Sequence, residues 1–278
     1  HPDPFPFNMY YALQAFFANG GGPCYIVPVG KMAADATVEK DRLLSGLDAI
    51  RKEDEVTLIV FPESLSLVTP DNLTDEAQAP GNYADFKAVY EQALKQCADL
   101  QDRFVIMDAL LDPKTTFITV ADAAKAFRSY GIGVEHLKYG AAYGPRIQTS
   151  FDYVYDPTAV KVTLPDGSET TVEDLDPKKE TGTENGRYYP LVKSALGRLP
   201  AKVSLAATIK PTLKGTNEEQ DGLNVHTTGK SINAIRQFTG RGTLVWGART
   251  LDGNSIVWRY VPVRRFFIMA EESIRMGT

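Results

Sequence analysis

The sequence reads Val56-Thr57-Leu58-Ile59-Val60-Phe61 and, further along, Arg103-Phe104-Val105-Ile106-Met107-Asp108. Both runs are short and rich in apolar residues, and the first is almost uninterrupted, which is the pattern of a strand covered on both faces. Between them, apolar residues recur at the spacing of one helical face: Phe86, Val89, Tyr90, Ala93, Leu94, Cys97 and Leu100. A strand, a helix and a second strand in this order form a right-handed crossover, so we predict that the two strands lie parallel in one sheet.

The same alternation of helix and strand continues on both sides of this unit. Upstream, we expect a helix that stops at Asn19-Gly20-Gly21-Gly22, a strand at Cys24–Val29, and a second helix marked by Leu43, Leu44, Leu47 and Ile50. Downstream, we expect a helix over Ala121–Tyr130 and an extended run from Gly140 to Arg146. The predicted fold class is α/β, with a parallel-sheet core and helices on both faces.

The character of the sequence changes after this run. Residues 152–163 alternate apolar and polar, and Pro165-Asp166-Gly167 predicts a turn between strands at Ala159–Leu164 and Ser168–Val172. The acidic stretch Glu173–Asn185 is typical of a surface loop, as is Lys214–Asp221, and Tyr188–Leu199 is expected to be helical. We therefore divide the chain into a first part of the core (1–149), a β-rich insertion (150–187) and a second part of the core (188–278).

The last part of the chain carries three further expectations. Gly229 is expected in a turn, and Ser231 is expected to cap a short helix over Ile232–Phe238. Trp246 and Trp258 are expected on strands that complete the sheet. A final helix is predicted over Val263–Met276, because positions 263, 266, 267, 270 and 274 are apolar and share one helical face.

Composition excludes some functions. The net charge is −5 and the pI is near 5.4, which disfavours a nucleic-acid groove as the main function. No apolar run approaches the roughly 20 residues that cross a bilayer, and the start, His1-Pro2-Asp3-Pro4, lacks the pattern of a signal peptide. The cysteines Cys24 and Cys97 lie in apolar stretches, so we predict two buried, reduced thiols.

No set of residues predicts a catalytic, cofactor or metal site. The histidines His1, His136 and His226 have no ligand-spaced neighbours. Gly229-Lys230-Ser231 resembles the end of a phosphate-binding loop, but Asn224 stands where that motif needs glycine. The alternative that stays open is a hydrolase site near Glu63 and Asp108, at the carboxyl ends of two predicted parallel strands.

Arginines and aromatic residues alternate near the end of the chain. The guanidinium groups, including that of Arg236, can stack on aromatic rings within the chain and pair with Glu271 and Glu272. They can equally belong to a subunit interface, where arginine and large aromatics are enriched. Both readings stay open for the candidate residues, which are Arg241, Trp246, Arg249, Trp258, Arg259, Arg264 and Arg265.

This region also carries a resemblance to a known family. The runs Gly240–Leu251, Val257–Phe267 and Glu271–Ile274 closely resemble the signature of contractile tail sheath proteins, found in myophage tails and extracellular contractile injection systems. Gly229–Arg236 resembles the segment before that signature. Other stretches resemble family landmarks in the expected order: Asn19–Tyr25, Val56–Pro62, Arg103–Asp108 and Tyr139–Gly144.

The resemblance implies a subtilisin-like α/β core without a protease triad. It implies a structural subunit that stacks as hexameric rings around an inner tube and contracts when a baseplate triggers it. Tube, baseplate and cap proteins would be its partners, and extended arms would add strands to neighbouring subunits. Assembly would take place in the bacterial cytoplasm, within a phage tail or an extracellular contractile particle.

Three departures from the family accompany the resemblance. Compared with the family pattern, the given sequence is expected to begin at the core, after the N-terminal arm. It is expected to end near the start of the C-terminal sheath region, which in the family contacts the tube and supplies the second arm. Between Leu199 and Ser204 it lacks residues that the family usually has.

Overall fold

A computed structural model describes residues 8–31, 37–68, 79–109, 120–144, 151, 154–178, 184–196 and 226–277. The chain divides into two compact units, a larger one from 6–148 and 205–278 and a smaller one from 149–204 with the first five residues. Several predictions lie wholly or partly outside the described residues: the extended run at 145–146, the alternation at 152–153, the end of the loop at 179–183, the helix end at 197–199, and the loop at 214–221.

The larger unit is built on a five-stranded sheet in the order β1-β2-β3-β6-β7. Its strands are β1 (Leu58–Val60), β2 (Phe104–Asp108), β3 (Gly140–Gly144), β6 (Ile232–Phe238) and β7 (Gly242–Trp246). The first four pair in parallel, with registers such as Ile59↔Val105 and Ile106↔Ala141, and β7 returns antiparallel to β6. The predicted α/β class with a mostly parallel sheet is confirmed.

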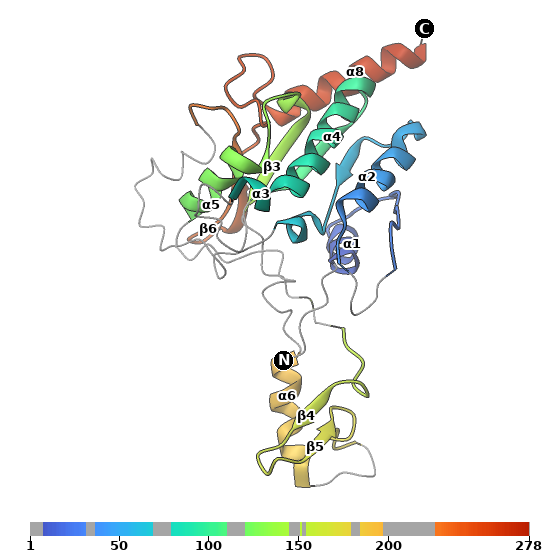
Figure 1. The fold of residues 1–278 in the computed structure, drawn as a ribbon, viewed down its shortest axis with the longest axis vertical. Helices are drawn as coiled ribbons and strands as arrows, with labels where there is room; N and C mark the ends of the chain where they lie inside the picture. Colours follow the sequence, from blue (N-terminus) through green and yellow to red (C-terminus); the bar gives the residue numbers. More distant parts are fainter. Residues whose placement is uncertain are drawn as a thin grey trace. The chain divides into compact units, whose positions relative to one another are not determined.

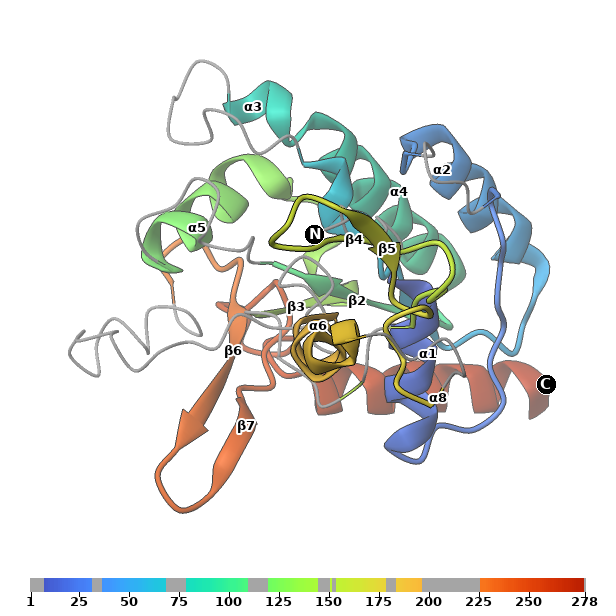
Figure 2. The ribbon, with the colours of Figure 1, turned by 90° about the horizontal axis from the view of Figure 1, so that it is seen from below.

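Helices lie on both sides of this sheet. In Figure 2, α2 (Lys40–Ala49), α4 (Ala84–Leu100) and α5 (Val120–Ala126) lie on one side, and α1 (Met9–Ala18) and α8 (Val261–Gly277) on the other. These helices fall where the apolar spacing predicted them. The shorter turns are η1 (Ile50–Lys52), η2 (Ser64–Leu67), α3 (Ala79–Asn82), the π-helical η3 (Phe127–Gly131) that continues α5, and η4 (Leu137–Tyr139).

The core of the larger unit lies between α4 and the sheet. Phe86, Tyr90 and Phe127 are fully buried, and their rings meet edge to face with centroids 4.7 and 6.3 Å apart. This geometry is the one that aromatic pairs prefer. Gln101 ends α4 in the left-handed conformation (φ 63°), and its N–H donates to the Cys97 carbonyl.

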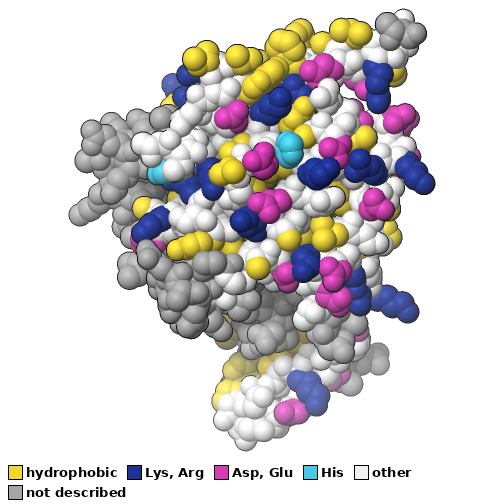
Figure 3. Space-filling model, turned by 45° about the horizontal axis from the view of Figure 1, so that its top comes forward, with side chains coloured by type: hydrophobic (Ala, Val, Ile, Leu, Met, Phe, Trp, Pro, Cys, Tyr) yellow, Lys and Arg dark blue, Asp and Glu magenta, His cyan; other side chains and the backbone are white. Residues whose placement is uncertain are grey.

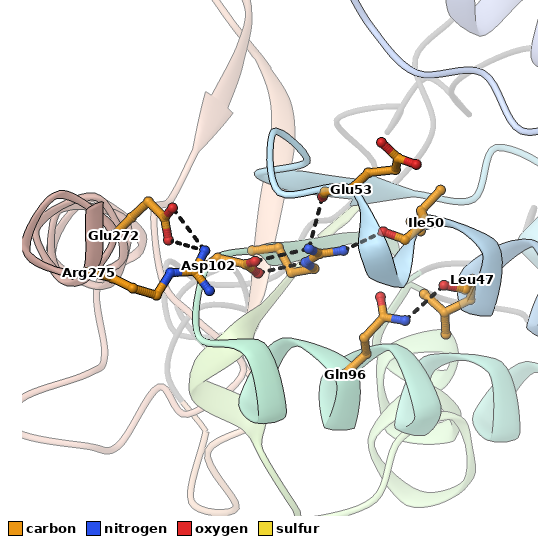
Figure 4. A network of polar contacts seen from close by, with 8 residues as sticks. Leu47, Ile50, Glu53, Gln96, Asp102, Glu272 and Arg275 are labelled. Atoms are coloured by element: carbon orange, nitrogen blue, oxygen red, sulfur yellow. Dashed lines mark hydrogen bonds and ion pairs between the residues drawn. The ribbon is translucent and has the colours of Figure 1, made fainter. Parts of the chain in front are cut away.

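A buried arginine joins α2 to β2. Arg103 pairs with Asp102 through two nitrogens at 2.6 and 3.0 Å, and donates to the carbonyls of Ile50 and Glu53 at 2.9 and 3.1 Å (Figure 4). The two carbonyls belong to the end of α2 and η1, where helix carbonyls lack intrahelical donors. Arg103, directly before β2, therefore supplies hydrogen-bond donors to carbonyls at the end of α2 and η1.

The smaller unit contains a hairpin and a helix (Figure 1). Strands β4 (Lys161–Thr163) and β5 (Glu169–Thr171) pair antiparallel across the predicted turn, in which Gly167 has φ 84°. The Asp166 carboxylate accepts hydrogen bonds from the Ser168 hydroxyl and backbone N–H, and these bonds lower the pKa of Asp166. After η5 (Glu184–Tyr188), α6 (Tyr189–Leu196) completes the described part of this unit, whose buried apolar residues are Leu164, Val172, Leu175 and Leu196.

Three expectations in the first half of the chain are wrong. Residues 24–29 form no strand and are mostly exposed, and Pro23 and Pro28, which lack a backbone N–H, disfavour pairing there. Cys24 is exposed, whereas Cys97 is buried as expected. Strand β1 is shorter than predicted and is covered on one face only: Ile59 is buried, whereas Leu58 and Val60 are exposed, as an outermost strand of the sheet allows.

Two expectations in the second half are also wrong. Residues 232–238 form the strand β6 rather than a helix, because they pair with β3 and β7 on either side. Pairing with neighbouring strands decides such short ambiguous runs. Trp258 lies in a turn and not on a strand. Arg249 and Tyr260 form an antiparallel bridge directly before α8. Among the described helices, none has the length and apolar character that crossing a membrane requires.

Candidate subunit interface

The strand ends near Glu63 and Asp108 are the first place to look for a site. The Glu63 carboxylate is buried and accepts a hydrogen bond of 2.8 Å from the backbone N–H of Met9, the first residue of α1. A carboxylate at this position favours the helix, because the N-terminal amides carry partial positive charge. Nearby, the Tyr90 hydroxyl donates to the buried Ser64 hydroxyl at 2.8 Å. Glu63 thus fixes the start of α1, which explains its burial without catalysis.

The two histidines in the described part of the chain, His136 and His226, have different neighbours. His136 is exposed in a left-handed turn (φ 58°), and His226 contacts the Thr228 hydroxyl at 2.8 Å. Partial burial lowers the pKa of His226, with a smaller contribution from Arg128. His1 lies outside the described residues. Across the described ranges, no three His, Cys, Asp or Glu side chains are grouped so that they could hold a metal ion.

Lys230, which the sequence places in a run similar to a phosphate-binding loop, bonds to backbone carbonyls of the same chain. Its ammonium group donates to the carbonyls of Arg128 and Ile132 at 2.6 and 2.8 Å, at the end of the helix formed by α5 and η3. In return, the Arg128 guanidinium donates to the Lys230 carbonyl at 3.2 Å. Burial lowers the pKa of Lys230. Gly229 precedes it with φ 79°, which confirms the predicted turn.

Arg264 is the most buried of the candidate arginines. Its guanidinium carbon lies 4.4 Å from the Tyr139 ring centroid and 4.9 Å from that of Trp258. Its nitrogens donate to both Glu271 oxygens, at 3.1 and 3.4 Å. The stacked arrangement pairs the cation with two π faces and one carboxylate. Arg264 and Trp258 therefore make their contacts within this chain.

Arg249 and Arg259 both lie beside Tyr260. Each guanidinium carbon is 5.6 Å from the Tyr260 ring centroid, and Arg249 also donates to the Gly253 carbonyl at 2.6 Å. The backbone of Arg249 is held by Asn233 on β6, a residue that sequence patterns did not single out. The Asn233 carboxamide is fully buried, and its role in holding Arg249 becomes visible only when β6 is placed in the sheet.

The remaining candidates are more accessible. Arg241 is exposed in the turn between β6 and β7, and Arg265 is half-buried on α8. Trp246, on β7, is 49% exposed although its ring lies 4.8 Å from that of Phe238. Phe238 also receives the Arg236 guanidinium at 4.4 Å from its centroid. Arg241 and Trp246 are thus the candidates best placed to meet another molecule.

The hairpin that carries them has an exposed edge. β7 is the last strand in the sheet order of the described part, and all five of its residues are exposed. Figure 2 shows β6 and β7 projecting from the rest of the sheet. The sequence of β7, Gly242-Thr243-Leu244-Val245-Trp246, contains neither a charge nor a proline, the usual protections of an edge strand.

A second apolar surface runs along α8. The predicted helix is confirmed, and the apolar positions do share one face, but that face points away from the core. Figure 3 shows apolar side chains gathered at the upper margin of the molecule, where α8 lies. The exposed apolar residues of this helix are Val263, Phe266, Phe267, Met269, Ile274 and Met276.

Comparison with solved structures finds ten similar chains, among them the two below. No family model matches the chain, and no curated protein matches it. One structure, the six-fold symmetrised cryo-EM structure of the anti-feeding prophage (AFP) baseplate, is similar over 96% of this chain and 56% of its own, with 24% identity and a TM-score of 0.44. The other, the PVC sheath complex of an extracellular contractile injection system in its contracted state, covers 97% and 56%, with 24% identity and a TM-score of 0.48.

The chain spans little more than half the length of each of these two chains. The second of them belongs to the PVC sheath complex of an extracellular contractile injection system.

Proposed function

We propose that this chain is part of a structural subunit of a contractile sheath, which polymerises in hexameric rings around an inner tube and contracts to drive the tube through a target envelope. Baseplate and cap proteins would bound the polymer, and assembly would take place in the bacterial cytoplasm. No cofactor and no catalytic step is part of this proposal.

One observation carries the proposal furthest, namely the exposed edge of β7. An uncharged edge strand is a ready template for a strand from another chain. Val245 is 58% exposed and Leu244 is also exposed, although their side chains point to opposite faces of the hairpin. A monomer gains nothing from leaving both faces of an apolar strand in water, whereas a subunit that receives a neighbour's strand buries them.

Contacts within the signature region, Gly240–Phe267, support the same function. Arg249 holds the segment between β7 and α8 in place: its guanidinium donates to the Gly253 carbonyl and lies beside the Tyr260 ring, and its backbone N–H donates to Asn233. Because this segment is held in place, a neighbouring subunit that pairs with β7 could pull on the hairpin without unfolding the sheet. In this proposal the signature segment stabilises the base of the β6–β7 hairpin, and β7 itself contacts neighbouring subunits.

Electron microscopy of the complete protein that contains this chain tests the proposal. We expect helical tubes under assembly conditions, and we expect Val245→Lys to abolish them, because it places a charge on the edge that a neighbour's strand would cover. The stability of the subunit should change by no more than about 0.5 kcal/mol, because Val245 is exposed.

Thr163→Lys is the matched control. Thr163 is also an exposed strand residue, but it lies on β4 in the smaller unit. Tubes should form normally in this variant. Tubes of normal length and number from the Val245→Lys protein would contradict the assignment of the β7 edge, and a complete protein that stays monomeric would contradict the function as a whole.

A further inference from the structure

Helix α8 has its charged residues directed inwards and its apolar residues directed outwards. Arg264 and Ile268 are the two members of the helix that are buried, at 1% and 4% exposure, and Glu271 and Glu272 are half-buried. Phe266 and Ile274, by contrast, are 58% and 66% exposed. A helix on the surface of a domain normally shows the opposite arrangement.

The helix consequently has few apolar anchors. In the hydrophobic core of the described residues, α8 contributes Ile268, with Val261 packed against the core from the first turn. Helix α4, which has the same length, buries seven residues. Burial of apolar surface is the main term that holds one element to another, so α8 is held more weakly than α4.

A polar clamp compensates for the missing apolar contacts. The Arg264 guanidinium lies over the rings of Tyr139 and Trp258. It also donates a hydrogen bond to the carboxylate of Glu271, two turns further along the same helix. The arginine side chain is 2% exposed and the Glu271 side chain 40% exposed, so the pair can be opened from the carboxylate side. The Arg264 Nε is buried without a hydrogen-bond partner among the described residues.

We propose that α8 detaches from and returns to the rest of the larger unit as one piece, which we call the strap. The contacts of Arg264 with Tyr139, Trp258 and Glu271 keep the strap closed. Opening exposes Ile268 and separates Phe267 from Trp258 and the Arg264 guanidinium from two rings, whereas it leaves the parallel sheet intact. We place the hinge at Tyr260, where the bridge to Arg249 ends and α8 begins. This inference does not depend on polymerisation, because it concerns the isolated chain.

Hydrogen exchange of the 278-residue chain, followed by mass spectrometry, tests the strap. Amides of α8 should exchange at least about tenfold faster than those of β2 and β3, because they exchange through local opening and the sheet through global unfolding. Glu271→Gln keeps the shape of the side chain but removes the charge that balances the buried Arg264. We expect it to accelerate exchange in α8 by roughly a further tenfold and to leave β2 and β3 less affected.

Glu272→Gln is the matched control for charge and position. Glu272 pairs at 2.8 Å with Arg275, whose side chain is 51% exposed and not buried like that of Arg264, so the loss of this pair should change exchange in α8 by less than about threefold. The double variant Arg264→Met/Glu271→Gln leaves no unbalanced buried charge, and it should exchange more slowly than Glu271→Gln alone.

A second measurement does not need the charge variants to fold. In Trp246→Phe, Trp258 is the only tryptophan left, and its emission reports on the stack with Arg264. We expect this emission to change at a lower urea concentration than the far-ultraviolet circular dichroism. The strap is overturned if both signals change together while α8 and the sheet exchange at one common rate, or if Glu272→Gln acts as strongly as Glu271→Gln.

Discussion

Asn233 on β6 holds the backbone of Arg249 through both ends of its carboxamide. The Asn233 Nδ2 donates to the Arg249 carbonyl at 2.8 Å, and the Arg249 N–H donates to Asn233 Oδ1 at 2.7 Å. The same Nδ2 also donates to the Ala142 carbonyl on β3 at 3.1 Å. One fully buried side chain thus joins two parallel strands to the segment that leads into α8.

Asn233→Leu should therefore destabilise the larger unit by about 3 kcal/mol, because it removes the partner of three backbone groups, of which that of Ala142 is buried and the two of Arg249 are partly buried. The change is measured as the shift of the urea midpoint by circular dichroism. Asn254→Ala is the control: Asn254 also donates two hydrogen bonds, to the carbonyls of His226 and Thr227, but it is exposed. A loss in Asn254→Ala as large as that in Asn233→Leu would contradict this account.

Arg103→Met should cost about 3–5 kcal/mol, because it leaves the buried Asp102 without its counter-charge and frees two carbonyls at the end of η1 (Figure 4). The variant Arg103→Met/Asp102→Asn should recover part of this loss. Arg51→Met is the control, since Arg51 pairs with Asp99 at 3.4 Å on the surface and should cost less than about 1 kcal/mol. Thermal denaturation of the four proteins decides the matter; equal losses at the two arginines would refute it.

The sequence predicts those parts of this fold in which local pattern and tertiary environment agree. Helix α4 and strand β2 were predictable because one has a strict helical period and the other is a short apolar run. Strand β6 was not, because Ile232–Phe238 is short and mixed, and its conformation follows from pairing with β3 and β7. Periodicity also placed the apolar residues of α8 on one face, but it carries no information on which way that face points.

The candidate site was predictable to a similar degree. Composition drew attention to the arginines and aromatics, but only the structure separates Arg264, which is stacked inside the unit, from Arg241, which is exposed in the hairpin turn. The exposed edge of β7 depends on the order of the strands, which no local pattern specifies. Asn233 and Tyr139, which hold the signature segment in place, lie far from it in the sequence.

Gly253→Ala should destabilise the larger unit by about 1–3 kcal/mol. A Cβ at this position would collide with the hydroxyl oxygen of Ser231, which is fully buried directly before β6 and donates to the Gly229 carbonyl. Gly133→Ala is the matched control, because its Cβ would meet only the exposed end of Glu91, which can move aside. Urea midpoints of the two variants should differ clearly, and a neutral Gly253→Ala would show that Ser231 is not fixed there.

The two thiols should react with a disulfide reagent at very different rates. Cys24 is exposed after the glycine turn, whereas Cys97 is fully buried on α4, where burial raises the pKa of its thiol. Since the thiolate is the reactive form, Cys97 at pH 8 reacts only when the chain opens, at least about a hundredfold more slowly than Cys24. Titration in the native state should thus give one fast thiol, and denaturant should release the second. Cys24→Ser should remove the fast phase entirely; if a fast thiol persisted in that variant, Cys97 would be accessible and α4 would not pack as described.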